Sequence, residues 1–327
     1  MSNSVDSESK KDFKNISDED RMNFFKMLKI GKDEKWANMM NWLETERGYE
    51  VVNLWEPAQI PNKAEGDSQV PRAVLYPPHE GTPRGAMIIC AGGAFLFKSD
   101  NEAWPVADYF YNKGFYTVIL DYRVTPYVAE DAGCDGNRAI QYLRANAERL
   151  NIDPNHISIG GFSAGGMLSN QAATKWNLGN PDATDPLEKF SSRPDAAILC
   201  YGTSMATNNL GFLGFDFATQ NELARKSPDA LLTPDCPPYF LFQTTSDDPR
   251  NLALMQYRLA CLGIPFEAHT FEGGNHGNGL YDGKNEVEDV PHTAHWAELC
   301  AEWLVGRGFH NKYKISEKSL RFVKKNA

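Results

Sequence analysis

Short apolar runs alternate with amphipathic segments over most of the chain, from Val70 onward. The apolar runs are rich in β-branched and aromatic residues, which is typical of buried strands, and the segments between them have helical spacing. Strands are expected at 72–76, 85–90, 116–122, 156–160, 196–201, 239–243 and 266–271, and helices at 102–112, 134–150, 164–175, 252–262 and 293–305. This alternation predicts an α/β fold with a mostly parallel sheet covered by helices on both faces.

The segment before this domain has a purely helical pattern. Ser17 and Asp20 form a cap-like pair ahead of a first apolar stripe, and Gly31 is expected to end that helix. A second stripe follows with spacing i, i+3, i+4 and i+7, formed by Trp36, Met39, Met40 and Leu43. We therefore expect residues 1–48 to form an N-terminal extension of two short helices. Their apolar faces need a cover, either the main domain or a second subunit of a homo-oligomer.

Residues 49–327 are expected to form the main domain, with two insertions at 177–194 and 203–238. Both insertions interrupt the strand and helix alternation and are rich in Pro, Asp or Gly. Loops of this length in a compact domain are usually functional or resemble lids.

Charge and composition exclude several classes of function. The chain has 33 Lys and Arg against 43 Asp and Glu, a net charge of −10, which disfavours binding to nucleic acid. No apolar stretch approaches the roughly 18 residues of a membrane span, and the N-terminus lacks the apolar core of a signal peptide. We therefore expect a soluble cytoplasmic protein with no membrane partner. The six cysteines match no zinc-ligand spacing and are expected to be reduced thiols, with no metal site.

The sequence Gly161-Phe162-Ser163-Ala164-Gly165 is the strongest chemical signal in the chain. It is a G-x-S-x-G between a predicted strand and a predicted helix, which is the context of a nucleophile elbow. Glycines on both sides of the serine allow neighbouring elements to approach a strained turn closely. Ser163 is thus the candidate nucleophile.

A serine hydroxyl needs a base, and the base needs an orienting carboxylate. His276 lies in a glycine-rich loop after the last predicted strand, where the carboxyl edge of a parallel sheet would place it near Ser163. Asp247 and Asp248 both follow the strand at 239–243. We favour Asp248 as the orienting acid and keep Asp247 as the alternative; the other residue would be solvated or cap the next helix.

The loop Ala91-Gly92-Gly93-Ala94-Phe95 follows the strand at 85–90. Its small side chains leave backbone N–H groups free to point inward, and with the N–H of Ala164 they could stabilise an oxyanion. The loop lacks the G-x-G-x-x-G fingerprint, so a nicotinamide cofactor is not expected, and we predict no cofactor of any kind.

Taken in order with Asp121-Tyr122-Arg123, these segments resemble an α/β-hydrolase esterase over about residues 70–305. The resemblance is greatest to the intracellular acetyl esterases and acetylxylan esterases, which are related to the hormone-sensitive-lipase-like esterases. It implies an eight-stranded sheet and mainly structural roles for Asp121 and Arg123. It also implies a set of site residues, namely the triad Ser163, Asp248 and His276 and the oxyanion-hole donors Gly93, Ala94 and Ala164.

The expected function is hydrolysis of small acyl esters, above all acetyl esters of a sugar or related alcohol, through an acyl-enzyme. The expected partner is therefore a small-molecule ester such as an acetylated oligosaccharide. Phe95 and Phe215 are candidates to line the acyl and alcohol pockets. Two alternatives are an amidase or peptidase on the same scaffold, such as an arylformamidase-like enzyme, and a binding protein that has lost catalysis.

Overall fold

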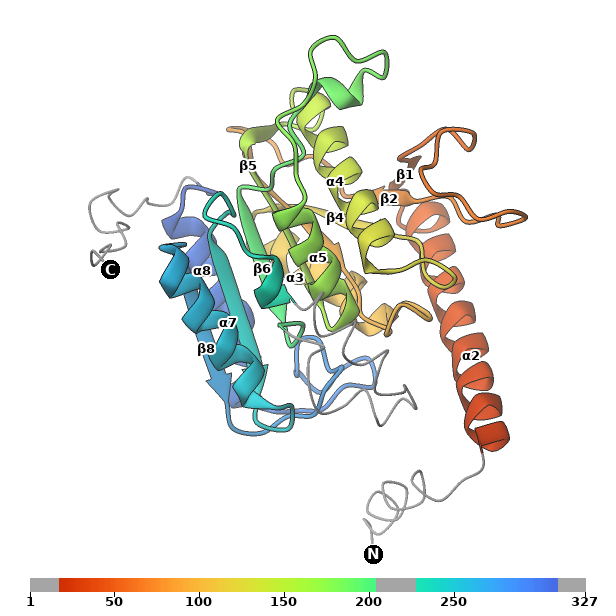
Figure 1. Cartoon of the computed structure of the whole chain (residues 1–327), viewed down its shortest axis with the longest axis vertical. Coiled ribbons are helices and arrows are strands. Elements are labelled where there is room, and N and C mark those ends of the chain that lie inside the picture. The colour runs from red at the N-terminus through yellow and green to blue at the C-terminus, as the bar shows by residue number, and fades with distance from the viewer. Residues whose placement is uncertain (1–17, 204–227, 311–327) are drawn as a thin grey trace, which may run out of the picture.

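A mixed sheet organises the part of the chain that the computed structural model describes, residues 18–203 and 228–310 (Figure 1). Its eight strands lie in the order β1-β2-β4-β3-β5-β6-β7-β8. The strands are β1 (Glu50–Asn53), β2 (Arg72–Leu75), β3 (Arg84–Cys90), β4 (Tyr116–Asp121), β5 (Ile152–Phe162), β6 (Ala196–Cys200), β7 (Tyr239–Thr244) and β8 (Phe266–Phe271). β2 is antiparallel to β1 and β4, and the other neighbours are parallel. The predicted eight-stranded, mostly parallel sheet is confirmed.

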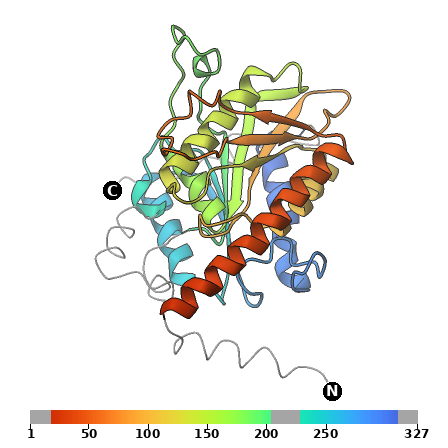
Figure 2. The ribbon, with the colours of Figure 1, turned by 90° about the vertical axis from the view of Figure 1, so that its right-hand side faces the viewer.

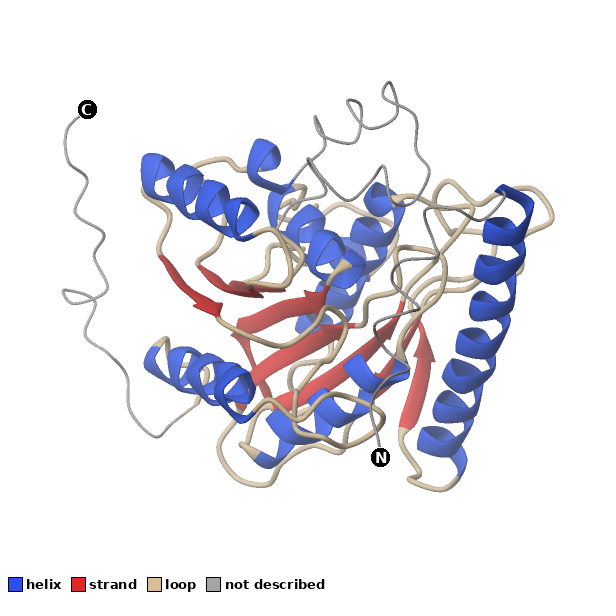
Figure 3. Cartoon of the chain, turned by 90° about the horizontal axis from the view of Figure 1, so that it is seen from below, coloured by secondary structure: helices blue, strands red, loops and turns tan. Residues whose placement is uncertain are grey.

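Helices cover both faces of the sheet (Figure 3). The α-helices are α2 (Asp18–Thr45), α3 (Trp104–Asn112), α4 (Ala129–Ala145), α5 (Ala164–Thr174), α7 (Pro249–Leu262) and α8 (Pro291–Gly306). The short 3-10 helices are η1 (Asp100–Glu102), η2 (Leu187–Lys189) and η3 (Pro228–Leu231). Helices α2, α3 and α8 share one apolar cluster, and α4, α5 and α7 contribute to two others on the opposite face.

The central strands are apolar throughout because both of their faces are buried. In β3, Met87 and Ile89 belong to the cluster with α3 and α8, whereas Ile88 and Cys90 belong to the cluster with α4. Successive side chains of a strand point to opposite faces, so each layer of helices receives every second residue.

The N-terminal extension contains one helix rather than two. α2 runs without interruption from Asp18 to Thr45 and crosses the domain obliquely (Figure 2). The expected end at Gly31 is wrong, because a glycine inside a helix costs only about 1 kcal/mol and its φ here is not positive. The stripe formed by Trp36, Met39, Met40 and Leu43 is buried in the main domain, as one of the two predicted arrangements requires.

The remaining differences concern boundaries and segments with weak patterns. β1 was not predicted, because this four-residue edge strand is at most half-buried and has no apolar run. α4 begins and ends five residues before the predicted helix at 134–150. The insertion at 177–194 is irregular apart from η2. Most of the second insertion, including Phe215, lies outside the described residues.

None of the described helices has the length and apolarity needed to cross a membrane.

The topology gathers five loops at one edge of the sheet. β3, β5, β6, β7 and β8 are consecutive neighbours and run parallel, so their carboxyl ends lie side by side. The loops that follow these strands begin with Ala91, Ser163, Tyr201, Thr245 and Glu272. In open α/β sheets this edge is where ligands bind.

Candidate active site

Ser163 occupies a sharp turn between β5 and α5. The strand ends at Phe162 and the helix begins at Ala164, which leaves Ser163 alone at the turn with φ 50° and ψ −117°. A positive φ is strained for a residue with a Cβ, and such strain is concentrated at functional sites. The backbone N–H of Ser163 donates to the carbonyl of Cys200 at 2.9 Å, which fixes the turn against β6. These are the strand, turn and helix expected of a nucleophile elbow.

The glycines that flank Ser163 are required by close backbone approach. A Cβ on Gly161 would lie 2.4 Å from the carbonyl oxygen of Cys90, and one on Gly165 would lie 2.0 Å from the same oxygen. Any larger residue at either position would push β5 or α5 away from the end of β3. This contact explains the spacing of the G-x-S-x-G sequence.

His276 and Asp247 form a hydrogen-bonded pair at the same edge of the sheet. The Nδ1 atom of His276 lies 2.9 Å from Oδ2 of Asp247. The imidazole keeps 45% of its side-chain surface exposed, whereas the Asp247 side chain is 16% exposed. With Nδ1 donating its proton to the carboxylate, Nε2 is the ring atom left to accept a proton.

The preference for Asp248 as the partner of His276 is wrong, and Asp247 makes this contact. Asp248 is the N-cap of α7; it accepts the N–H of Arg250 at 3.0 Å and pairs with the guanidinium of that residue. Asp247 belongs to the turn before the helix, which Ser246 fixes to the His276 loop by donating to the carbonyl of Gly274 at 2.7 Å. Asp247 therefore meets the histidine while Asp248 begins α7.

The loop that carries His276 is held on several sides. Side chains from α8, η1 and the loop itself donate to its carbonyl groups. These bonds are Thr293 to Gly273 at 3.0 Å, Tyr281 to Asn275 at 2.8 Å, Asn101 to Gly277 at 3.0 Å and Trp296 to Gly279 at 3.0 Å. These bonds fix the position of His276 in a loop that is rich in glycine.

Electrostatics favour the protonated form of His276. Burial by itself lowers the pKa of the imidazole. The hydrogen bond and charge of Asp247, with a further contribution from the charge of Glu102, outweigh burial, so the pKa of His276 is raised above its usual value. An imidazolium formed at this position is therefore stabilised.

The loop after β3 lies directly against Ser163. A Cβ on Gly92 would be 3.1 Å from the Cβ of Ser163. Gly93, Ala94 and Phe95 all have positive φ, at 137°, 53° and 57°. Among the described residues, no hydrogen bond uses the N–H of Gly93 or Ala94. The geometry leaves these donors available, and their role as an oxyanion hole with Ala164 stays a prediction.

The aromatic candidates for the substrate pocket stay predictions as well. The side chain of Phe95 is half-buried, and its ring centroid lies 6.3 Å from that of Tyr122. The backbone carbonyl of Phe95 accepts the N–H of Thr125 at 2.7 Å.

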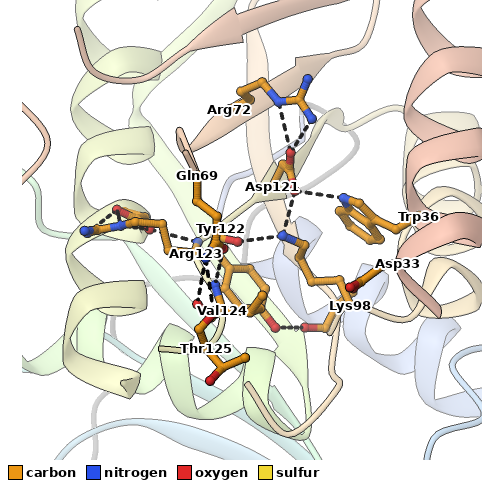
Figure 4. Close-up of polar contacts among 12 residues, drawn as sticks. Asp33, Trp36, Gln69, Arg72, Lys98, Asp121, Tyr122, Arg123, Val124 and Thr125 are labelled. Atoms are coloured by element: carbon orange, nitrogen blue, oxygen red, sulfur yellow. Dashed lines mark hydrogen bonds and ion pairs between the residues drawn. The ribbon is translucent and has the colours of Figure 1, made fainter. Parts of the chain in front are cut away.

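Lys98 anchors the far end of this loop to the body of the protein (Figure 4). Its ammonium lies 2.8 Å from Oδ1 of Asp121 and donates to the carbonyl of Tyr122 at 2.7 Å. Asp121 also accepts hydrogen bonds from Arg72 and from the indole of Trp36 on α2. The carboxylate thus joins β2, β4, α2 and the loop, which supports the structural role that the resemblance implied for it.

Arg123 is paired with Asp135 at 2.8 Å, and both side chains are fully buried. This contact agrees with a structural role, as the resemblance implied for Arg123. In the described part of the chain, no three His, Cys, Asp or Glu side chains are grouped as metal ligands would be.

Two residues of the site were missed from the sequence. Tyr201 follows β6 at the carboxyl edge, and its ring lies 4.7 Å from that of His276. Its position as the last residue of the predicted strand at 196–201 was an available signal. Glu102 lies in η1, is 2% exposed and accepts the N–H of Gly92 at 2.8 Å. No sequence pattern marks it, because a single Glu at the start of a helix is usually exposed.

Comparison with known proteins agrees with this geometry. The BD-FAE family profile matches residues 73–253. A solved acetyl ester-xyloside bifunctional hydrolase from Caldicellulosiruptor lactoaceticus is 30% identical, with a TM-score of 0.71 over 80% of this chain and 97% of that one.

Two curated relatives match parts of the chain. Endo-1,4-beta-xylanase B of Butyrivibrio fibrisolvens is 28% identical over 69% of this chain, and an acetylxylan esterase of Xylanibacter ruminicola is 25% identical over 39%. The aligned regions span 37% and 24% of these two relatives, which are longer proteins. The family profile covers more than half of the chain, and the resemblance to α/β-hydrolase esterases is confirmed. This protein therefore belongs to the BD-FAE family and has the α/β-hydrolase fold.

Proposed function

We propose that the protein is a serine esterase that removes small acyl groups, above all acetyl, from a sugar or related alcohol. The observation that carries this proposal is the 2.9 Å bond between His276 and Asp247 at the sheet edge that also holds the strained turn of Ser163. The acetyl ester-xyloside hydrolase and acetylxylan esterase among its relatives support an acetylated sugar as the substrate class.

In the proposed reaction, Oγ of Ser163 attacks the ester carbonyl while Nε2 of His276 accepts the hydroxyl proton. Asp247 holds the imidazole by its Nδ1–H and stabilises the imidazolium. The N–H groups of Gly93, Ala94 and Ala164 stabilise the oxyanion of the tetrahedral intermediate. When that intermediate collapses, the proton on His276 passes to the departing alcohol and an acyl-Ser163 ester remains.

Water then completes the cycle. His276 removes a proton from the water molecule, and the resulting hydroxide attacks the acyl-Ser163 carbonyl. The second tetrahedral intermediate releases the carboxylic acid and returns the proton to Oγ of Ser163.

Hydrolysis of p-nitrophenyl acetate by wild type and Ser163→Ala tests the proposed nucleophile. We expect the variant to lose about 10⁴-fold or more in kcat/KM. Ser169→Ala is a matched control, because Ser169 lies in the same helix, α5, and its hydroxyl bonds to the carbonyl of Gly165 and to Cys90, not to His276 or Asp247. Equal turnover by wild type and Ser163→Ala would refute the proposal.

Substrate class requires a second measurement. The p-nitrophenyl esters of acetate, butyrate and octanoate should be cleaved in that order of kcat/KM, and acetylated xylo-oligosaccharides should release acetate. A preference for octanoate would overturn the small-acyl assignment, and failure on every acetylated sugar would overturn the alcohol assignment.

A further inference from the structure

Glu102 is a buried acidic side chain within the site that the proposed mechanism does not use. It lies at the end of η1, between the loop after β3 and the loop after β6, and is 2% exposed. Its Oε2 accepts the N–H of Gly92 at 2.8 Å, and its Oε1 accepts the hydroxyl of Tyr201 at 2.6 Å. One carboxyl group therefore joins two of the five loops at the carboxyl edge.

The hydrogen-bond pattern fits the ionised form of Glu102. A backbone N–H can only donate, so Oε2 must accept from Gly92. The hydroxyl of Tyr201 accepts the N–H of Gly279 at 3.1 Å, which leaves its single proton for Oε1 of Glu102. Burial keeps Tyr201 protonated by raising its pKa well above the usual value. Neither oxygen of Glu102 needs a proton of its own.

Ionised Glu102 is costly for the fold. Burial raises the pKa of its carboxyl group, while the bonds from Tyr201 and Gly92 and the charge of His276 oppose this only in part. The ionised carboxyl group is therefore less stable in the folded protein than in water. A neutral side chain of the same shape would remove this unfavourable contribution to the free energy of folding. A role that needs the charge accounts for a carboxylate at this position.

Both partners of Glu102 contact the proposed catalytic residues. A Cβ on Gly92 would lie 2.6 Å from Oε2 of Glu102 and 3.1 Å from the Cβ of Ser163, so Gly92 is held between these two side chains. The ring of Tyr201 lies 4.7 Å from the ring of His276, and its hydroxyl binds the end of the His276 loop. Asn101, next to Glu102, donates to Gly277 of the same loop at 3.0 Å.

We infer that Glu102 is a positioning residue of the active site: its carboxylate fixes the Gly92 loop and Tyr201 relative to Ser163 and His276, and its charge stabilises the imidazolium. This inference rests on the proposed function, because it assigns Glu102 a part in the same reaction. Glu102 touches neither the reacting atoms nor the substrate in this scheme and acts through its neighbours.

The charge has a consequence for pH dependence. Among the described residues, the ionisable groups that face His276 are Asp247 after β7, Tyr201 after β6 and Glu102 in η1. The charge of Lys32 in α2 also acts on Glu102. Tyr201 is neutral, so Asp247 and Glu102 are the negative charges that favour a protonated His276. Removing the charge of Glu102 while keeping its shape should therefore make the imidazole easier to deprotonate.

The test compares Glu102→Gln, Tyr201→Phe and Glu286→Gln with wild type, using kcat/KM for p-nitrophenyl acetate from pH 5 to 9 and thermal unfolding. Glu286→Gln is the matched control, because it removes an exposed carboxylate from the same region that pairs with Lys35. Glu102→Gln should lower kcat/KM by about 10-fold or more. The glutamine amide has only one oxygen, so either the N–H of Gly92 or the hydroxyl of Tyr201 faces an NH₂ group in place of an acceptor. It should also move the acid-limb midpoint down by about half a pH unit, with Tm within about 4 °C of wild type.

Tyr201→Phe separates position from charge. It should lower kcat/KM but leave the acid-limb midpoint at or above the wild-type value, because Glu102 keeps its charge. Glu286→Gln should leave both quantities unchanged. The inference is wrong if Glu102→Gln keeps the wild-type kcat/KM, or if its acid-limb midpoint moves down no further than that of Glu286→Gln. Failure of the proposed function is recognised separately, by full activity of Ser163→Ala.

Discussion

At the scale of single residues, adjacent aspartates after β7 have different surroundings. Asp247 is bonded to His276 at 2.9 Å, and Asp248 caps α7 through Arg250. Asp247→Asn should lower kcat by about 10³–10⁴-fold, because an amide holds the imidazole in the wrong tautomer. Asp248→Asn should stay within about 3-fold of wild type, since Asn also caps helices well. Kinetics on p-nitrophenyl acetate decide between them, and the reverse ranking would restore Asp248 as the acid.

The pKa of His276 sets the pH dependence of the proposed reaction. The imidazole must be neutral to accept the proton of Ser163, so activity should fall as the pH drops through its pKa. Asp247 and Glu102 raise that pKa above its usual value despite burial. The acid limb of kcat/KM should therefore have a midpoint above about 6.5. A pH profile that stays flat down to pH 6 would contradict the proposed role of His276.

At the scale of elements, α2 shows how a local rule can be overridden. Glycine commonly ends helices, yet α2 continues through Gly31. The apolar stripe from Trp36 to Leu43 is buried in the core and stabilises the continuous helix. A Cβ at Gly31 would meet nothing within 4 Å, and its φ is not positive. Gly31→Ala should therefore stabilise the protein by about 0.5–1 kcal/mol.

Urea unfolding measures this change. If the chain bent at Gly31 in solution with a left-handed backbone, alanine there would be strained and would destabilise instead. Loss of stability in Gly31→Ala would thus favour the two separate helices that the sequence predicted.

Elements with a continuous apolar pattern were predictable, and those that depend on tertiary contacts were not. The strand over Phe266–Phe271 has its predicted bounds, and the turn of Ser163 lies where the G-x-S-x-G sequence placed it. β1 was missed because its pairing with β2, rather than its own composition, makes it a strand. The choice between Asp247 and Asp248 depends on the direction of one turn, which residue type and spacing do not encode.

At the scale of the whole molecule, Asp121 connects parts of the chain that are distant in sequence. Its carboxylate binds Arg72 of β2, Lys98 at the end of the Gly92 loop and Trp36 of α2 (Figure 4). Lys98 and Asp121 are 11% and 9% exposed, so their pairing is scarcely screened by solvent. The exposed pair of Lys35 and Glu286 also joins α2 to the active-site edge, but at 46% and 79% exposure.

Lys98→Met and Lys35→Met compare these two connections directly. Lys98→Met should lower the free energy of unfolding by about 2–4 kcal/mol, because it leaves a buried carboxylate with less compensation. Lys35→Met should cost less than about 1 kcal/mol, as exposed pairs do. Urea unfolding at pH 7 gives both values. Equal costs would mean that the buried pair is no stronger than a surface pair.

The same pair predicts how stability depends on pH. Burial raises the pKa of Asp121, but the charges of Lys98 and Arg72 outweigh it, so the pKa lies below its usual value near 3.8. A carboxyl group whose pKa is lowered by folding stabilises the protein above the unfolded-state pKa, and this contribution is lost as the pH falls through the folded-state pKa. In wild type the loss should therefore occur below about pH 4. Without Lys98 the pKa of Asp121 rises toward or above its unfolded-state value, so the acid-labile contribution of Asp121 shrinks, and the unfolding free energy of Lys98→Met should fall less on acidification than that of Lys35→Met. Identical acid-unfolding curves for the two variants would show that Asp121 does not depend on Lys98 for its charge.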